Sequence, residues 1–85
     1  MKLWLLLPVD GLTDNPWDPW FDKCFGFVIR AETEQAARDK AHRNAEEENK
    51  GANTKSPWLD YKYSTCEPLL SDGEEAIIMK DFRGS

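Results

Sequence analysis

Apolar side chains in this chain occur in short runs separated by polar segments that contain glycine, proline or aspartate. Residues 3–9 form the first run, in which leucines at alternate positions face one side of an extended backbone while Trp4 and Leu6 face the other. Residues 25–30 form the second run, and their aromatic and β-branched side chains suit a buried strand. Both runs therefore predict β-strands, and the first strand has two apolar faces.

A helical pattern follows the second strand almost at once. Thr33 is an N-cap residue, and Glu34 places a negative charge at the positive end of the helix dipole. The apolar positions that follow have the helical period and hold only alanine, which lets a helix lie close to the bulky side chains of a sheet. Three glutamates at residues 46–48 oppose the dipole at the far end, so we expect the helix to fray there. The alanines are Ala36, Ala37, Ala41 and Ala45.

The rest of the chain predicts two more strands. Side chains alternate with a period of two over residues 61–66, and again over residues 75–82 after a turn at residues 71–73. Prolines within residues 10–23 predict a long loop between the first two strands. The order strand, strand, helix, strand, strand predicts one α+β domain over residues 1–85, with an antiparallel sheet of about four strands and one helix on one face.

A single alanine-faced helix covers only one side of such a sheet. The side chains that we expect on the second face are apolar as well, so something other than the helix has to cover them. Either the tryptophan-rich loop folds over this face or another chain does. The side chains concerned are Trp4, Leu6, Val28 and either Ile78 or Met79.

The charge balance narrows the choice of partner. The 85 residues include 16 acidic and 11 basic side chains, for a net charge of −5. This excess of negative charge argues against direct binding to a nucleic-acid backbone or an anionic membrane, and it favours a protein partner with a basic surface. Two cysteines are too few for a secreted disulfide scaffold, so we expect reduced thiols and a cytoplasmic location.

No pattern typical of a catalytic, cofactor-binding or metal site is present. The aspartates of the first loop recur every four residues, whereas a calcium loop needs alternate oxygen ligands around a central glycine. Cys24, Cys66 and His42 lack the short spacing of zinc ligands, and we expect His42 to face solvent. We therefore predict no metal, no cofactor and no enzymatic activity. The alternative is a small enzyme that uses Cys24 or Cys66 as its nucleophile.

The first loop holds the candidate partner-binding residues. Tryptophans next to prolines are rigid anchors and make strong interface hot spots. The acidic side chains that flank them would complement a basic surface. The alternative is that these tryptophans roof the open face of the sheet, and the same residues can serve both purposes. The predicted partner-binding residues are Asp14, Trp17, Asp18, Trp20 and Asp22.

Two segments carry a resemblance to other proteins. Residues 2–12 read KLWLLLPVDGL, and residues 27–33 read FVIRAET before the helical residues 36–38. Together they resemble a group of small uncharacterised bacterial and phage-borne proteins, over most of the chain. The resemblance implies no activity and no site residue. In size, acidity and single-helix α+β layout the chain is also similar to anti-CRISPR proteins, small phage inhibitors that often block nucleic-acid-binding surfaces of host effector complexes.

These observations favour a non-enzymatic binding protein. Our first hypothesis is an inhibitor, borne by a phage or mobile element, that presents acid-flanked tryptophans to a basic, nucleic-acid-binding protein. A second hypothesis, from another class, is a housekeeping interaction module that forms homodimers through the open face of its sheet.

Overall fold

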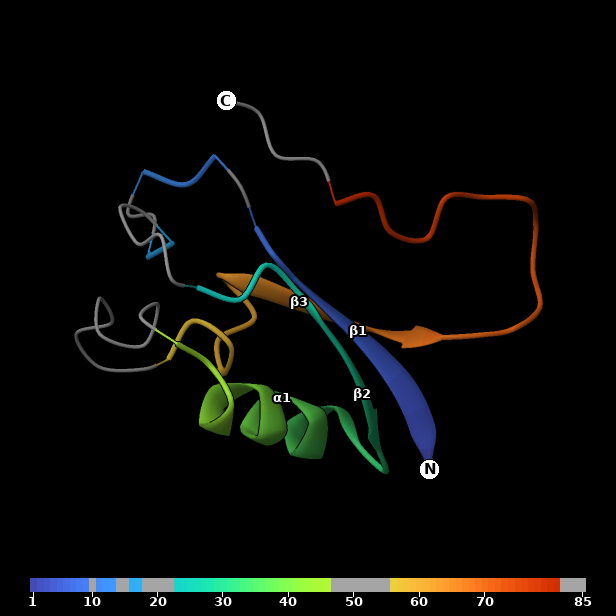
Figure 1. The fold of residues 1–85 in the computed structure, drawn as a ribbon, viewed down its shortest axis with the longest axis horizontal. Coiled ribbons are helices and arrows are strands. Elements are labelled where there is room, and N and C mark those ends of the chain that lie inside the picture. Colours follow the sequence, from blue (N-terminus) through green and yellow to red (C-terminus); the bar gives the residue numbers. More distant parts are fainter. Residues whose placement is uncertain (10, 14–15, 18–22, 47–55, 82–85) are drawn as a thin grey trace.

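The structure, a computed structural model, describes residues 1–9, 11–13, 16–17, 23–46 and 56–81. These residues contain the elements β1 (Lys2–Pro8), β2 (Phe27–Ala31), α1 (Glu34–Arg43) and β3 (Ser64–Leu69). The strands form an antiparallel sheet in the order β2-β1-β3, and α1 packs on one face of it (Figure 1). The predicted α+β class, with an antiparallel sheet and one helix, is confirmed.

The register of the strands decides which side chains face the helix. Trp4 lies opposite Ile29, and Leu6 lies opposite Phe27 on one side and Cys66 on the other. Directly opposite residues of antiparallel strands point to the same face, so these five side chains share the face that α1 covers, which we call the inner face. The core that they form also contains Trp17, Ala31, Ala37, Ala41 and Trp58.

The opposite face of the sheet, which we call the outer face, is apolar too. Leu5 and Val28 lie opposite each other on it, together with the other odd-numbered leucines of β1. Val28 lies on the face that the helix does not cover, as expected, but the expectation that Trp4 and Leu6 lie there is wrong, because both are on the inner face. Both faces of β1 are apolar, and its pairing with β2 places Trp4 opposite Ile29 and Leu5 opposite Val28.

Both ends of α1 have satisfied backbone groups. The Thr33 hydroxyl accepts a hydrogen bond from the Ala36 N–H at 3.1 Å, as the predicted N-cap requires. At the other end, the Asn44 side-chain amide donates to the Lys40 carbonyl at 2.8 Å. The backbone N–H of Asn44 donates to the Lys40 carbonyl as well, and to the Ala41 carbonyl. The helix therefore ends at Arg43, before the three glutamates where the sequence predicts fraying.

β3 begins at Ser64 rather than at Tyr61, because Asp60 closes a turn there. The Asp60 side chain accepts a hydrogen bond from the Lys62 N–H at 2.9 Å. Its carbonyl accepts from the N–H groups of Tyr63 and Ser64, at 3.0 and 3.1 Å. A short acceptor side chain that holds its own backbone in a turn thus overrides the strand-like alternation of these residues.

The approach to β2 is crowded at Gly26, and the strand begins at Phe27, after the predicted start at residue 25. A Cβ on Gly26 would lie 3.1 Å from a methyl group of Leu7 and 3.3 Å from the Leu6 carbonyl oxygen. A larger residue at position 26 would therefore require the Leu7 side chain and the β1 backbone to shift by a few tenths of an ångström.

The fourth strand that the sequence predicts over residues 75–82 is not shown. Residues 75–81 have no regular secondary structure, and Phe82 lies outside the described residues. After β3 the chain loops out beyond the ends of the strands and returns as an irregular segment (Figure 1). Ile77 and Ile78 in this segment are 79% and 58% exposed. The alternation of side chains is therefore present without the strand pairing that would bury them.

Two tryptophans enlarge the inner core. Trp17 is 4% exposed and Trp58 is fully buried, and their rings meet edge to face with centroids 4.8 Å apart. Trp58 meets the Phe27 ring in the same way at 4.9 Å. The Trp17 indole N–H donates to the Tyr63 carbonyl at 3.2 Å. Trp17 therefore extends the core on the helix side of the sheet and does not roof the outer face.

Candidate protein-interaction surfaces

The structure describes one of the five predicted partner-binding residues. Trp17 lies in the inner core, so its ring is not a surface anchor in this structure. Asp14, Asp18, Trp20 and Asp22 lie outside the described residues. The surface that these four would form stays a prediction, whereas Trp17 has a structural role.

Arg38 joins the helix to the segment before β3, and sequence reasoning missed it. The side chain is 5% exposed. Its guanidinium donates to the Trp58 carbonyl at 3.0 Å, the Ser64 hydroxyl at 2.8 Å and the Ser64 carbonyl at 3.1 Å. Its Nε donates to the Glu34 carboxylate at 2.9 Å. The Ser64 hydroxyl extends this hydrogen-bond network, because it donates in turn to the Pro57 carbonyl at 2.8 Å.

This network has a structural role. A buried guanidinium is stable only when its donors find acceptors, and here backbone carbonyls, a hydroxyl and a carboxylate supply them. The sequence contains one local signal, the spacing of four residues between Glu34 and Arg38. The acceptors at Trp58 and Ser64 lie 20 and 26 residues away, so no local pattern points to them.

No disulfide joins the two cysteines. Burial raises the pKa of the Cys66 thiol to about 11, so this thiol is protonated near neutral pH. Cys24 is half-buried, and its Sγ lies 3.8 Å from the Asn44 carbonyl oxygen. His42 is half-buried on α1 and does not simply face solvent as expected. Among the described residues, no three His, Cys, Asp or Glu side chains are grouped to hold a metal ion.

The larger candidate surface is a groove of about 920 Å³ on the outer face, between the sheet and the segment that follows β3. Leu5, Leu7 and Leu69 line it from the strands, and Ile77 and Ile78 line it from the segment. Four carboxylates lie along the same groove, and its lining contains no lysine or arginine. We call it the acidic groove. Its carboxylates are Glu67, Asp72, Glu74 and Glu75.

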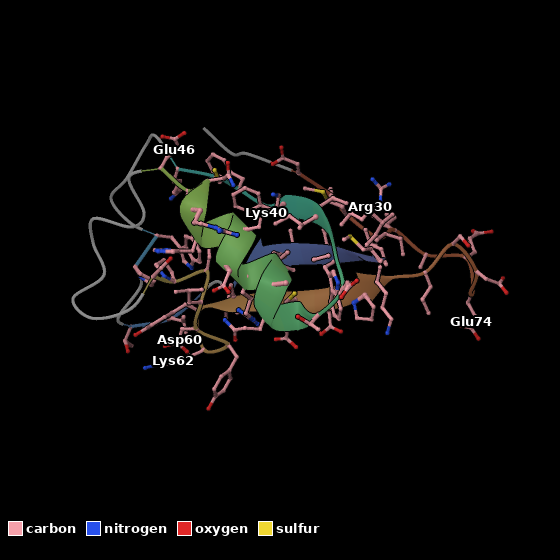
Figure 2. All side chains as sticks on the ribbon, turned by 90° about the horizontal axis from the view of Figure 1, so that it is seen from below. Arg30, Lys40, Glu46, Asp60, Lys62 and Glu74 are labelled. Carbon is pink, nitrogen blue, oxygen red and sulfur yellow. The ribbon has the colours of Figure 1, made fainter. Side chains whose placement is uncertain are left out.

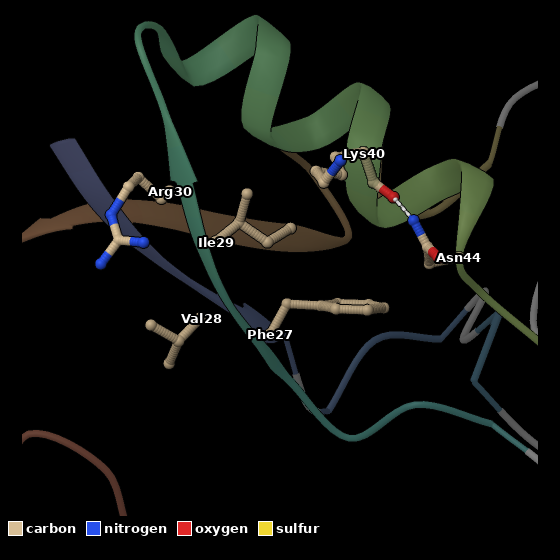
Figure 3. A pocket seen from close by; sticks show the side chains of 6 residues that line it. All are labelled: Phe27, Val28, Ile29, Arg30, Lys40 and Asn44. Carbon is tan, nitrogen blue, oxygen red and sulfur yellow. Dashed lines mark hydrogen bonds between the residues drawn. The ribbon is translucent and has the colours of Figure 1, made fainter. Parts of the chain in front are cut away.

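A second hollow, of about 390 Å³, lies along β2 and has the opposite charge. We call it the β2 pocket; it is lined by Phe27, Val28, Ile29, Arg30, Lys40 and Asn44. Side chains of β2 alternate at this pocket: Phe27 and Ile29 point toward the helix, whereas Val28 and Arg30 point away from it (Figure 3). Figure 2 shows Arg30 and Lys40 on the β2 side of the molecule, with Glu74 at the tip of the C-terminal segment. The pocket lining contains no acidic residue.

The chain matches no protein-family model, no curated protein and no solved structure. Within the described part of the chain, no helix has the length and apolar character to cross a membrane.

Proposed function

We propose that the chain is a non-enzymatic protein-binding protein that presents the acidic groove to a partner with a basic surface. The composition of the groove is the observation that supports this proposal. Leucine and isoleucine side chains form its apolar part, and all of its charged side chains are acidic. An apolar centre with a polar margin is the usual anatomy of a protein interface.

The two components of the groove have separate effects on binding. Burial of the apolar side chains supplies affinity, because it removes apolar surface from water. The exposed carboxylates raise the rate of association with a basic partner, and salt screens their effect. The proposed complex therefore forms faster and binds more tightly at low salt.

Nucleic-acid-binding proteins form the class of basic partner that fits best. Their grooves accept a row of phosphates, and a row of carboxylates can occupy the same groove. We therefore propose an inhibitor that competes with nucleic acid in the cytoplasm, borne by a phage or mobile element and similar in type to anti-CRISPR proteins. The further residues of the proposed surface are Asp14, Asp18, Trp20 and Asp22.

Competition binding tests this function. Labelled chain is titrated with purified bacterial nucleic-acid-binding complexes, RNA-guided nucleases among them, with and without their oligonucleotide. We expect the chain and the oligonucleotide to exclude each other, and the affinity to fall as salt rises. Binding that neither salt nor oligonucleotide changes, or no binding to any complex, would contradict the proposal.

A pair of charge reversals tests the surface itself. Glu67 lies in the acidic groove, opposite Leu5 on the outer face. The substitution Glu67→Lys should weaken binding to the basic partner about tenfold or more. Glu32→Lys changes an exposed carboxylate outside the groove and should alter binding less than about twofold. If the two variants bind equally well, the groove is not the binding surface.

A further inference from the structure

β2 is an edge of the sheet. It pairs with β1 on one side, and no described strand lies on its other side. Half of the N–H and C=O groups of such a strand point away from the sheet, where an added strand can pair with them. β2 contains no proline that would block pairing. Among the described residues, this edge of β2 therefore has no strand partner and is a candidate for strand addition.

The β2 pocket specifies the chemistry of the added strand. Arg30 and Lys40 bring positive charge to this edge of an otherwise acidic protein. Val28 is 56% exposed beside them. An extended segment with a carboxylate near Arg30 and apolar side chains along the rest of β2 would satisfy both features.

Antiparallel pairing fixes the spacing of these side chains. We number the residues of the added strand from the one that lies opposite Arg30. Position 1 then pairs with Arg30, position 3 with Val28 and position 4 with Phe27. Positions 1 and 3 face outward with Arg30 and Val28, whereas position 4 faces inward with Phe27. The edge therefore selects a carboxylate at position 1 and apolar side chains at positions 3 and 4.

The chain contains this pattern in its own C-terminal segment, as Glu75-Ala76-Ile77-Ile78. Ile77 is 79% exposed and Ile78 is 58% exposed, so the segment buries these two side chains only partly in its present position. The bend after β3 carries the chain out beyond the strand ends before it runs back (Figure 1), and residues 75–78 then line the acidic groove with Leu5 and Leu7. Residues 75–78 also have the alternation of a strand without a strand partner.

We propose that two copies of the chain associate by strand exchange, in which residues 75–79 of each copy pair antiparallel with β2 of the other. Glu75 then lies opposite Arg30, Ile77 opposite Val28, and Met79 opposite Gly26. The absence of a side chain on Gly26 leaves room for Met79, whose methyl group already lies 3.4 Å from the Cβ position of Gly26 within one copy. Because the exchange is reciprocal, it closes as a dimer. Glu75, Ile77 and Ile78 also line the acidic groove, so the exchange takes one wall of the groove away from its own sheet, and dimer formation should compete with partner binding there.

Sedimentation equilibrium of the full chain and two charge-reversed variants tests the exchange. The first variant is Arg30→Glu with Lys40→Glu, and the second is Glu74→Lys with Glu75→Lys. Each alone places like charges across the edge and should weaken the dimer about tenfold or more. An equal mixture of the two restores opposite charges at both exchanged strands and should form heterodimers about as tightly as the wild type.

Two further variants separate the exchange from folding. Ile77→Lys replaces a side chain that is already in solvent, so the monomer should fold normally while the dimer weakens. Asp39→Lys changes an exposed carboxylate of α1 that lines neither the β2 pocket nor the acidic groove, and it should leave the dimer unchanged.

A chain that stays monomeric at all concentrations overturns the proposal. Protection of the β2 amides from hydrogen exchange in such a monomer would not rescue it, because the protecting segment would then belong to the same copy. A dimer that is unchanged by both charge-reversed variants, or one that their mixture fails to restore, overturns it as well.

Discussion

Arg38→Ala should destabilise the fold more than any other single truncation of a charged side chain described here. The Arg38 guanidinium donates to the carbonyls of Trp58 and Ser64 and to the Ser64 hydroxyl, all within 3.1 Å. The substitution removes the charged donor of these interior acceptors. The Ser64 hydroxyl can still donate to Pro57, so the loss falls mainly on the two carbonyls.

The size of the effect follows from the burial of the network. A hydrogen bond to a charged group contributes about 1.5–3 kcal/mol, and removing one member of a buried charged network costs about 3–5 kcal/mol. The Glu34 carboxylate is half exposed, so its ion pair with Arg38 adds little. We expect the free energy of unfolding to fall by about 3–5 kcal/mol. A chain of this length has about 4–13 kcal/mol in total, so the substitution removes a large fraction of the stability.

Urea unfolding followed by tryptophan fluorescence measures the loss, because Trp17 and Trp58 leave the core when the chain unfolds. Arg43→Ala, at an exposed position of the same helix, is the matched control and should cost about 0.5 kcal/mol or less. Arg38→Met keeps the aliphatic stem and so separates lost packing from lost hydrogen bonds. If Arg38→Ala costs no more than Arg43→Ala, the network does not hold the segment before β3 on the helix.

Three further predictions concern the helix cap, the approach to β2 and the buried thiol. Thr33→Ala should lower the free energy of unfolding by about 1 kcal/mol while Thr33→Ser retains it, and equal urea midpoints would contradict the cap. Gly26→Ala should cost about 1–2 kcal/mol in the same assay, because its Cβ would press on the Leu6 carbonyl oxygen, and an unchanged or raised midpoint would show that β1 yields. The Cys66 thiol has a pKa of 9.0 when unfolded and about 11 when folded, so its contribution to stability is complete below pH 9 and lost as pH rises through 11. Stability measured from pH 8 to about 11 should therefore fall less steeply in Cys66→Ala than in the wild type.

The sequence predicts the parts of this fold whose signals are local. The N-cap at Thr33 and the alanine stripe need only neighbouring residues to be recognised, and the helix begins where they indicate. The apolar runs of β1 and β2 likewise predict strands within two residues of their observed starts. Local periodicity fails at Asp60, where a side chain that bonds to its own backbone turns the chain before β3 begins.

The features that depend on distant residues could not be predicted. Both faces of β1 are apolar, so the sequence pattern alone does not decide which face meets the helix. The pairing of Trp4 with Ile29 decides it. The burial of Arg38 depends on acceptors 20 and 26 residues further along the chain. The acidic groove could not be predicted for the same reason, because it joins β1 to a segment about 70 residues away.

The exposed apolar side chains connect stability with association. Val28, Ile77 and Ile78 are each more than half exposed, and fully burying one such side chain contributes about 1.5–3 kcal/mol. Covering all three therefore offers a gain of several kcal/mol, on the order of the lower limit of stability for a chain of this length. Any molecule that covers them only in the folded state raises the free energy of unfolding by mass action. Ile77→Lys should accordingly weaken association and leave the monomer as stable as before, because in the monomer this side chain is already in water.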